Sequence, residues 1–162
     1  MKICALRYGI VYGEREWYGR VLTEFIKRVV LENKPPVIFG DGKQRRDYIY
    51  VKDVVDFHNL MIEEEWDGFE VFNIGSGNSI TIKELAYLII DITNKDMEPI
   101  FEDIPEGSYS NITGRWRIPK ELKILELNIS KAMKKGWKPR TSLREGIKKK
   151  LIGYTQIQID GI

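Results

Sequence analysis

A chain of 162 residues is long enough to bury one sizeable core and is most simply a single domain, residues 1–162. Hydrophobic residues make up 43% of it, and no apolar run approaches the roughly 20 residues of a membrane span. With no segment that resembles a signal peptide, this composition predicts a soluble globular protein. The net charge of +2 argues against a protein that binds nucleic acid through its overall charge.

The first predicted element is a buried strand from Lys2 to Tyr12, which ends at Gly13. Its apolar run is typical of a parallel sheet, in which strands are covered by helices on both faces and flanked by other strands. The strand holds the lone cysteine, Cys4. We expect this residue to fill space in the core of a protein from a reducing, cytoplasmic compartment.

A helix is predicted from Val21 to Leu31, because its apolar residues recur at helical spacing and Pro35-Pro36 follows. The next stretch, Val37 to Asp53, has strand-favouring runs on both sides of the turn Gly40-Asp41-Gly42 and carries basic residues after that turn. Guanidinium groups beside aromatic rings suit a ligand with a planar base and phosphates, because the Arg fork matches phosphate oxygens. An ordinary hairpin with a solvated basic face is the other interpretation of these local features.

Asp53 is predicted to cap a helix that reaches Glu64. This helix carries His58, the only histidine, and with no second histidine and no cysteine nearby in the sequence we expect no metal site. A strand from Glu70 to Ile74 follows, with its turn at Gly75-Ser76-Gly77.

Thr81 and Glu84 have the spacing of a capping box for a helix that runs to about Thr93. Residues 94–116 then predict a long irregular loop around one strand near Ile100 and Phe101. The remaining predicted elements are a short strand from Lys123 to Leu127, a short helix that starts at Asn128 or Ser130, and a last helix capped by Ser142 with Glu145.

Residues 131–150 carry nine Lys or Arg residues and one acidic residue. Such a run is typical of a solvated helical face. Contact with DNA or RNA is the alternative, and it would show a steep dependence of affinity on salt.

Four segments follow one another in the order of motifs known from a single protein family. They are Ala5–Gly13 (ALRYGIVYG), Gly40–Asp53 (GDGKQRRDYIYVKD), Phe72–Leu85 (FNIGSGNSITIKEL) and Asn128–Gly146 (with NISKA, GWKP and SLREG). In this respect the chain resembles the nucleotide-sugar epimerases and dehydratases, the extended short-chain dehydrogenases, and within them most closely the UDP-glucose 4-epimerases. The correspondence covers nearly the whole chain but only the C-terminal half of the family.

The resemblance implies an α/β fold, an incomplete Rossmann-like structure with part of the parallel sheet and a small mixed α/β substrate-binding subdomain, mainly residues 14–52 and 94–150. The family's NAD-binding glycine-rich turn and its catalytic tyrosine and lysine lie in the other half. We therefore expect no catalytic and no NAD-binding residues here, and no activity of this chain by itself. A partner chain with the N-terminal half would supply NAD.

The family pattern places Arg46 on the diphosphate of a nucleotide sugar, most simply a UDP-sugar, and Tyr48 beside the ribose or phosphate. It places Val37 and Phe39 along the base. Other roles are open for two of these residues, because Phe39 is compatible with a plain core position and Tyr48 with a cross-strand pair.

Two further arginines are candidates for the same ligand. Arg20 stands where the family often has an asparagine that touches the diphosphate. Arg117 lies next to Ile118–Glu121 (IPKE), where the family has an arginine and an acid for phosphate and ribose. The family's substrate-contacting asparagine in the first motif is Ile10 here, which removes a polar contact.

Two patterns imitate motifs of the missing half. Gly75-Ser76-Gly77 lacks the third glycine of a dinucleotide fingerprint, because position 80 is Ile, and it is better interpreted as a tight turn. Tyr48 and Lys52 have the spacing of a catalytic pair, but the strand-favouring residues between them predict a separation of about 13 Å, not neighbours on a helix.

Besides contact with nucleic acid through residues 131–150, two functions remain open at this stage. The first is the nucleotide-sugar-binding portion of an epimerase-like enzyme, as a fragment or as one half of a split enzyme. The second is a non-catalytic module that associates with itself through the face left bare by the missing half, which would make the protein a homo-oligomer.

Overall fold

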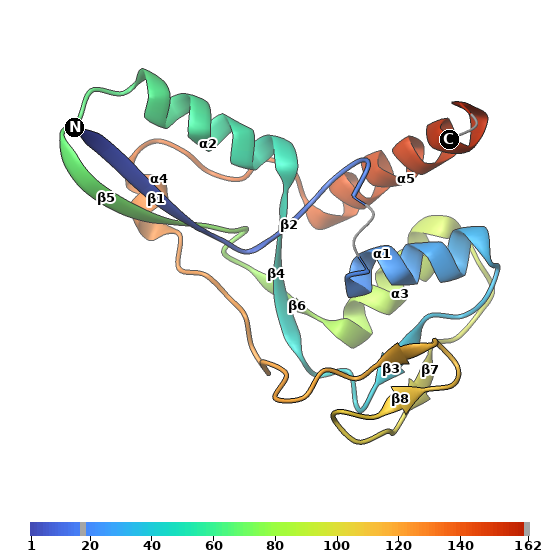
Figure 1. Ribbon diagram of the computed structural model, residues 1–162. Helices are drawn as coiled ribbons and strands as arrows, with labels where there is room; N and C mark the ends of the chain where they lie inside the picture. Colours follow the sequence, from blue (N-terminus) through green and yellow to red (C-terminus); the bar gives the residue numbers. More distant parts are fainter. Residues whose placement is uncertain (17–18, 161–162) are drawn as a thin grey trace. The chain divides into compact units, whose positions relative to one another are not determined.

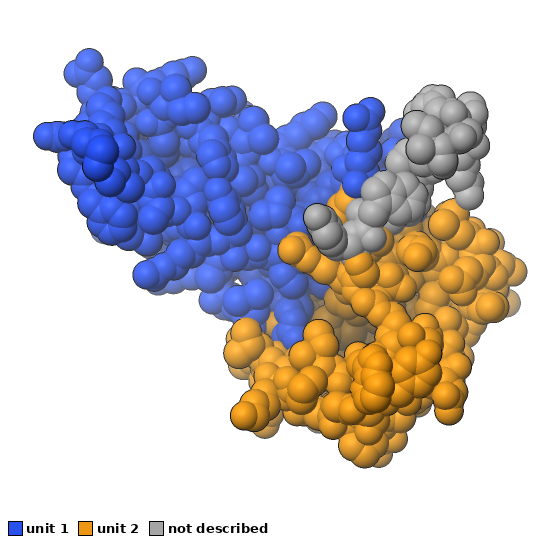
Figure 2. Space-filling model, in the orientation of Figure 1, with its two compact units in different colours: residues 1–15, 46–79, 125–162 blue, residues 16–45, 80–124 orange. Residues whose placement is uncertain are grey.

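The computed structural model describes residues 1–16 and 19–160, with the backbone alone for residues 154–160 (Figure 1). The chain divides into two compact units, coloured separately in Figure 2. Unit 1 comprises Met1–Arg15, Arg46–Ser79 and Leu125–Ile162, and unit 2 comprises Glu16–Arg45 and Ile80–Ile124. The boundaries of these units differ from those of the expected substrate-binding subdomain, residues 14–52 and 94–150.

Unit 1 contains two parallel strand pairs. Strand β1 (Lys2–Tyr8) pairs along its whole length with β5 (Gly68–Ile74), and β2 (Ile10–Tyr12) pairs with β4 (Arg45–Tyr50), whose first residue belongs to unit 2. The prediction of a single strand from Lys2 to Tyr12 is therefore wrong, because Gly9 interrupts it. The prediction that this strand is buried is wrong for β1 as well, since no residue of β1 falls in the buried class.

Helices α2 (Val51–Glu63), α4 (Ser130–Lys134) and α5 (Leu143–Asp160) complete unit 1. The core between α2 and β5 is aromatic, with the Phe57 ring centroid 5.2 Å from that of Phe72 and 5.4 Å from that of Trp137. Buried aromatic pairs at such separations pack favourably beyond their area alone. These rings fix α2 against the sheet and against the segment that follows α4.

The predicted cap at Asp53 is wrong. Helix α2 begins two residues earlier, with Tyr50 as its N-cap, and Asp53 is buried in its first turn. The carboxylate of Asp53 instead accepts hydrogen bonds from the backbone N–H groups of Arg140 and Thr141, both at 3.1 Å. It therefore anchors the segment just before α5.

In unit 2, helix α3 (Ile82–Thr93) contacts helix α1 (Val21–Ile26), the π-helical segment η1 (Lys27–Leu31) that continues α1, and strand β3 (Val37–Phe39). Strand β3 pairs in parallel with β7 (Ile100–Glu102), so the hairpin interpretation of the stretch around the glycine turn is wrong: β3 and β4 pair with different strands. The other elements are β8 (Tyr109–Ser110) and β9 (Arg115–Trp116), with β6 (Ser79–Thr81) leading into α3 across the unit boundary.

The region after α3 holds more order than expected. The predicted strand near Ile100 is β7, but the antiparallel pair β8–β9 was not predicted. The predicted strand from Lys123 to Leu127 is wrong, because that segment makes only an isolated bridge between Ile124 and Arg45 among the described residues.

The buried carboxylate of Asp47 ties three segments of unit 1 together. It is 0% exposed, and its Oδ1 accepts from the N–H and the hydroxyl of Ser76, at 2.7 and 2.6 Å. Its Oδ2 accepts from the N–H of Leu127 at 3.2 Å. A buried carboxylate is tolerated when its oxygens are hydrogen-bonded in this way. Strand β4, the turn after β5 and the chain before α4 thus meet at one side chain.

We expect Asp47→Ala to lower the free energy of unfolding by about 3 kcal/mol, because it leaves buried N–H donors without their charged acceptor. Urea unfolding followed by circular dichroism measures the change. Asp56→Ala, at an exposed position of the same unit, should change it by no more than about 0.5 kcal/mol. Equal effects of the two substitutions would contradict the role given to Asp47.

The capping box that starts α3 is confirmed. The N–H of Glu84 donates to Oγ1 of Thr81 at 3.0 Å, and the N–H of Thr81 donates to Oε2 of Glu84 at 2.9 Å. These hydrogen bonds from Thr81 lower the pKa of the Glu84 carboxyl. The box at the start of α5, Ser142 with Glu145, is confirmed too.

Thr81→Ala should destabilise the protein by about 1 kcal/mol, since it removes an acceptor for an end N–H group of α3. Thr81→Ser keeps the hydroxyl and should recover most of the loss. Thermal unfolding of the three proteins provides the comparison, and a serine variant as unstable as the alanine variant would show that the hydroxyl is not the cause.

Candidate functional site

Strand β4 presents the candidate residues Arg46 and Tyr48 on one face and Asp47 on the other, because side chains alternate along a strand. Arg46 is half-buried, whereas Tyr48 is only 4% exposed. The structure thus brings these two residues together in unit 1. It leaves little of the Tyr48 side chain open to a ligand.

The ring of Tyr48 belongs to an aromatic cluster. Tyr12 lies edge-on to it, with ring centroids 6.2 Å apart, and Tyr50 lies 5.8 Å from Tyr12. Burial, followed by the negative charge of Asp53, raises the pKa of the Tyr12 hydroxyl, so this group stays protonated. In register, Tyr48 faces Ile10 of β2, which agrees with the cross-strand role left open for it.

Val37 and Phe39 lie at the two ends of β3 in unit 2. Val37 is 6% exposed and Phe39 is half-buried, so Phe39 offers the more accessible side chain. The carbonyl of Phe39 accepts a hydrogen bond from the amide Nε2 of Gln44 at 3.3 Å, and the same nitrogen lies 3.3 Å from Oε2 of Glu121. Gln44 therefore connects the end of β3 to the acid in the IPKE segment.

Arg117 is placed against the glycine corner that follows β3. A Cβ atom at Gly40, whose φ is +70°, would come within 3.1 Å of the Arg117 guanidinium. Nη1 of Arg117 donates to the carbonyl of Ile104, and its backbone N–H and carbonyl continue the β8–β9 pairing through Ser108 and Gly107. The structure thus brings Arg117 to the end of β3 in unit 2, held by the chain around it.

Arg20 is exposed at the N-cap of α1, where its carbonyl accepts the N–H of Glu24 at 3.0 Å. A neighbouring guanidinium that the sequence analysis did not select lies here as well. Arg115 forms an ion pair with Glu24 at 3.1 Å and donates to the carbonyl of Gly19. The nearness of Arg115 to α1 depends on a contact across more than ninety positions, and no local pattern indicates it.

The Gly75-Ser76-Gly77 turn is confirmed as a turn that follows β5. A Cβ at Gly75 would lie 2.5 Å from Oδ2 of Asp47, and the N–H of Ser76 already donates to the same carboxylate. The glycine is needed for a side-chain carboxylate to approach. A phosphate would meet a negative charge in that place, so the turn does not fit the pyrophosphate of a dinucleotide.

Tyr48 and Lys52 do not share a helix, as expected. Tyr48 lies in β4, and Lys52 lies in the first turn of α2. Among the described residues, no group of His, Cys, Asp and Glu is arranged to hold a metal ion. Nε2 of His58 lies 3.0 Å from the hydroxyl of Tyr8.

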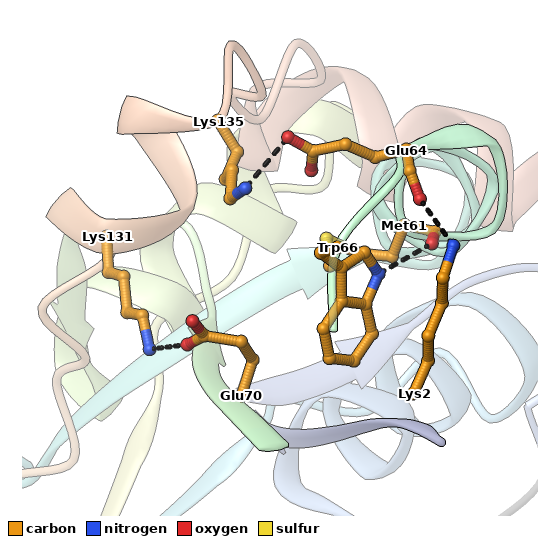
Figure 3. Close-up of polar contacts among 7 residues, drawn as sticks. All are labelled: Lys2, Met61, Glu64, Trp66, Glu70, Lys131 and Lys135. Carbon is orange, nitrogen blue, oxygen red and sulfur yellow. Dashed lines mark hydrogen bonds and ion pairs between the residues drawn. The ribbon is translucent and has the colours of Figure 1, made fainter. Parts of the chain in front are cut away.

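Most basic residues of the run 131–150 are exposed, in agreement with a solvated face, but four of them make specific contacts. Lys131 and Lys135 form ion pairs with Glu70 and Glu64 (Figure 3). The ammonium of Lys149 lies 5.0 Å from the centre of the Tyr50 ring. The most unusual member is Lys150, which is 0% exposed and donates to the carbonyl of Gly13 at 3.1 Å.

Comparisons with known proteins agree with this fold. A model of the NAD dependent epimerase/dehydratase family matches residues 1–75. A putative UDP-glucose 4-epimerase of Methanocaldococcus jannaschii is 36% identical over 147 residues, which are 89% of this chain and 43% of that protein. A UDP-glucuronate 4-epimerase of Thermodesulfobacterium geofontis is 28% identical over 92% of this chain and 42% of its own length.

Solved structures give the same result. The UDP-glucose 4-epimerase of Thermotoga maritima, crystallised with UDP-glucose, superposes with a TM-score of 0.78 at 34% identity, over 96% of this chain and 46% of that one. A UDP-glucuronic acid 4-epimerase of Bacillus cereus, in complex with UDP-glucuronic acid and NAD, gives 0.77 at 30% identity, over 94% and 45%. The parallel α/β architecture is therefore that of a Rossmann-like extended short-chain dehydrogenase, of which this chain spans about half the length.

No helix among the described residues is both long and apolar enough to span a bilayer. Sequence motifs, relatives and architecture agree, and the chain belongs to the NAD dependent epimerase/dehydratase family.

Proposed function

We propose that this chain is the nucleotide-sugar-binding portion of a UDP-glucose 4-epimerase-like enzyme and that it takes a UDP-sugar. The observation that carries the proposal is the match of 96% of the chain to a UDP-glucose 4-epimerase crystallised with UDP-glucose. Relatives that act on other UDP-sugars match over similar lengths, so the base and diphosphate are better supported than the sugar.

Arg46 is the residue to which we assign the diphosphate. A guanidinium can bind two phosphate oxygens at once and keeps its charge at any physiological pH. It stands on a strand whose opposite face is held by the buried carboxylate of Asp47, so its backbone is fixed before a ligand arrives. Tyr48, on the same face of the strand, is assigned a place beside the ribose or phosphate, although its ring packs on Tyr12 and is largely buried.

In unit 2 we assign the base to the end of β3, with Phe39 as apolar contact and the backbone of Val37 and Phe39 as hydrogen-bonding groups. Arg117, at the neighbouring glycine corner, and Arg20, exposed at the start of α1, are the additional cations for phosphate oxygens. Both assignments rest on position and charge.

NAD belongs to the family's reaction, where it accepts and returns a hydride at the sugar. The turn in this chain that most resembles a dinucleotide site is filled by the Asp47 carboxylate, as described above, and does not fit the cofactor. We therefore propose that NAD and the catalytic tyrosine and lysine come from another polypeptide segment. By itself the chain should bind a UDP-sugar and leave it unchanged.

Binding is testable by thermal unfolding in the presence of UDP, dTDP and GDP. A ligand at 100 times its Kd should stabilise the chain by about 2.7 kcal/mol, because it binds the folded state only. UDP and UDP-glucose should raise the melting temperature more than GDP does. Absence of a shift with every nucleotide and with UDP-sugars would refute the proposed function.

Arg46→Gln should raise the Kd for UDP by roughly tenfold or more, since it removes a charge-assisted pair of hydrogen bonds worth more than about 1.4 kcal/mol. The matched control is Arg7→Gln, at an exposed position of β1 outside the assigned site. Titration calorimetry with UDP on both variants gives the comparison. An unchanged Kd in the Arg46 variant would remove this residue from the site.

A further inference from the structure

The hairpin of β8 and β9 has one exposed and one packed face. On the exposed face, Tyr109 and Trp116 pair across the strands and are 49% and 67% exposed. On the other face, Ser110 lies opposite Arg115 and is 0% exposed. Residues directly opposite each other in an antiparallel pair share a face, so Arg115 points the same way as the buried serine.

Ser110 and Arg28 anchor this hairpin within unit 2. The hydroxyl of Ser110 donates to Oε2 of Glu102, the last residue of β7, at 2.6 Å. Nη1 of Arg28 in η1 lies 3.5 Å from the carbonyl of Ile112, in the hairpin's loop. The backbone that carries Arg115 is therefore held by two other elements.

Arg115 joins the hairpin to the start of α1. Its Nη1 lies 3.1 Å from Oε1 of Glu24, and its Nη2 donates to the carbonyl of Gly19. A Cβ atom at Gly19 would lie 2.5 Å from Nη2, so this approach of the guanidinium requires a glycine. A guanidinium has five donors in a fixed fork, and here one side chain binds two points of the chain at once.

These two points lie on either side of Arg20. Gly19 precedes it, and the N–H of Glu24 donates to the carbonyl of Arg20 at 3.0 Å, which closes the first turn of α1. Arg20 is the N-cap of this helix, has extended backbone angles (φ −79°, ψ 154°) and is exposed. Arg115 therefore fixes the backbone from which the Arg20 side chain extends.

The same hairpin carries Arg117. Its backbone N–H donates to the carbonyl of Ser108 at 2.8 Å, which continues the strand pairing. Residues two apart on a strand share a face, and Arg115 reaches the start of α1 while Arg117 reaches the corner at Gly40. One strand thus sets both additional cations, Arg117 by carrying it and Arg20 through Arg115.

We propose that Arg115 is a positioning residue for the diphosphate of the nucleotide sugar: it holds the start of α1 so that the guanidinium of Arg20 is in place before the ligand arrives. This inference rests on the proposed function, in which Arg20 is a cation for phosphate oxygens. A group that is already fixed near its bound position loses less conformational freedom on binding, so the affinity is higher.

Direct binding of phosphate by Arg115 fits these contacts less well. Its Nη1 and Nη2 already have acceptors, and the carboxylate of Glu24 lies beside them. A diphosphate that approached Arg115 would meet this negative charge. Removal of the carboxylate separates the two roles, because it loosens the start of α1 if Arg115 is a positioning residue, and it unmasks a cation if Arg115 binds phosphate.

The first measurement needs no ligand. In Arg115→Gln the hydrogen of the Glu24 amide should exchange at least roughly fivefold faster, because the first turn of α1 opens more often. Lys34→Gln is the matched control, since it removes the same charge from a side chain of unit 2 that is 61% exposed, and it should leave the rate unchanged. An unchanged rate in the Arg115 variant, measured by NMR, would overturn the proposal.

Titration calorimetry with UDP then measures the role in binding. Arg115→Gln should raise the Kd about fivefold, and Glu24→Ala should raise it about threefold although it removes a negative charge. Asp96→Ala removes a negative charge from another exposed position of unit 2 and should leave the Kd within about twofold. Tighter binding of UDP by the Glu24 variant would assign the phosphate to Arg115 itself and overturn the positioning role.

A double-mutant cycle with Arg20 distinguishes positioning from a general loss of structure. In an Arg20→Gln background, Arg115→Gln should change the Kd by less than about twofold, because the side chain that Arg115 places is gone. Equal effects in both backgrounds would refute the coupling. Thermal unfolding shows which variants are folded, and Glu24→Ala keeps both arginines, so it tests the same claim if Arg115→Gln does not fold.

The two proposals fail in different ways. If the unsubstituted chain binds no UDP, the proposed function is refuted, and the binding role of Arg115 with it. If the unsubstituted chain binds UDP and Arg115→Gln binds it with the same Kd, only the positioning role is refuted.

Discussion

The buried carboxylate of Asp47 is the interaction on which the rest of unit 1 depends. It lies 29 residues from Ser76 and 80 residues from Leu127 in sequence, and it accepts hydrogen bonds from both. Burying this charge is tolerable only because N–H and O–H donors surround it. The close packing of Asp47 also explains why two neighbouring positions are glycines. A Cβ at Gly9 would lie 2.8 Å from the Asp47 carbonyl oxygen, and one at Gly75 would lie 2.5 Å from its carboxylate.

This constraint also shapes the chemistry that the chain can offer. With Asp47 on the inner face of β4, the alternation of a strand directs Arg46 and Tyr48 to the other face. The turn that resembles a dinucleotide site is then filled by a carboxylate, which already accepts the N–H of Ser76. Neighbouring residues of β4 thus have different roles: Asp47 fixes the packing on one face of the strand, and in our proposal Arg46 binds the diphosphate on the other.

The sheet of unit 1 is narrow for a parallel sheet. Its pair β1–β5 is held by the aromatic core around Phe57 and by ion pairs such as that of Lys131 with Glu70. Those contacts join β5 to α2 and α4. No strand among the described residues pairs with the outer edge of β1.

The sequence by itself determined the elements whose signals are local. The capping boxes at Thr81 and Ser142, helix α3 and strand β5 could be predicted because their hydrogen-bond partners or apolar periods lie within a few residues. The family resemblance added the order of the motifs and the candidate arginines. What depended on distant segments could not be predicted, such as the hydrogen bonds of Asp53 to residues 87 and 88 positions away, the β8–β9 pair, and the packing of Arg117 on Gly40. Only the tertiary structure decided these, because burial and long-range hydrogen bonds, which no local pattern encodes, choose the partner.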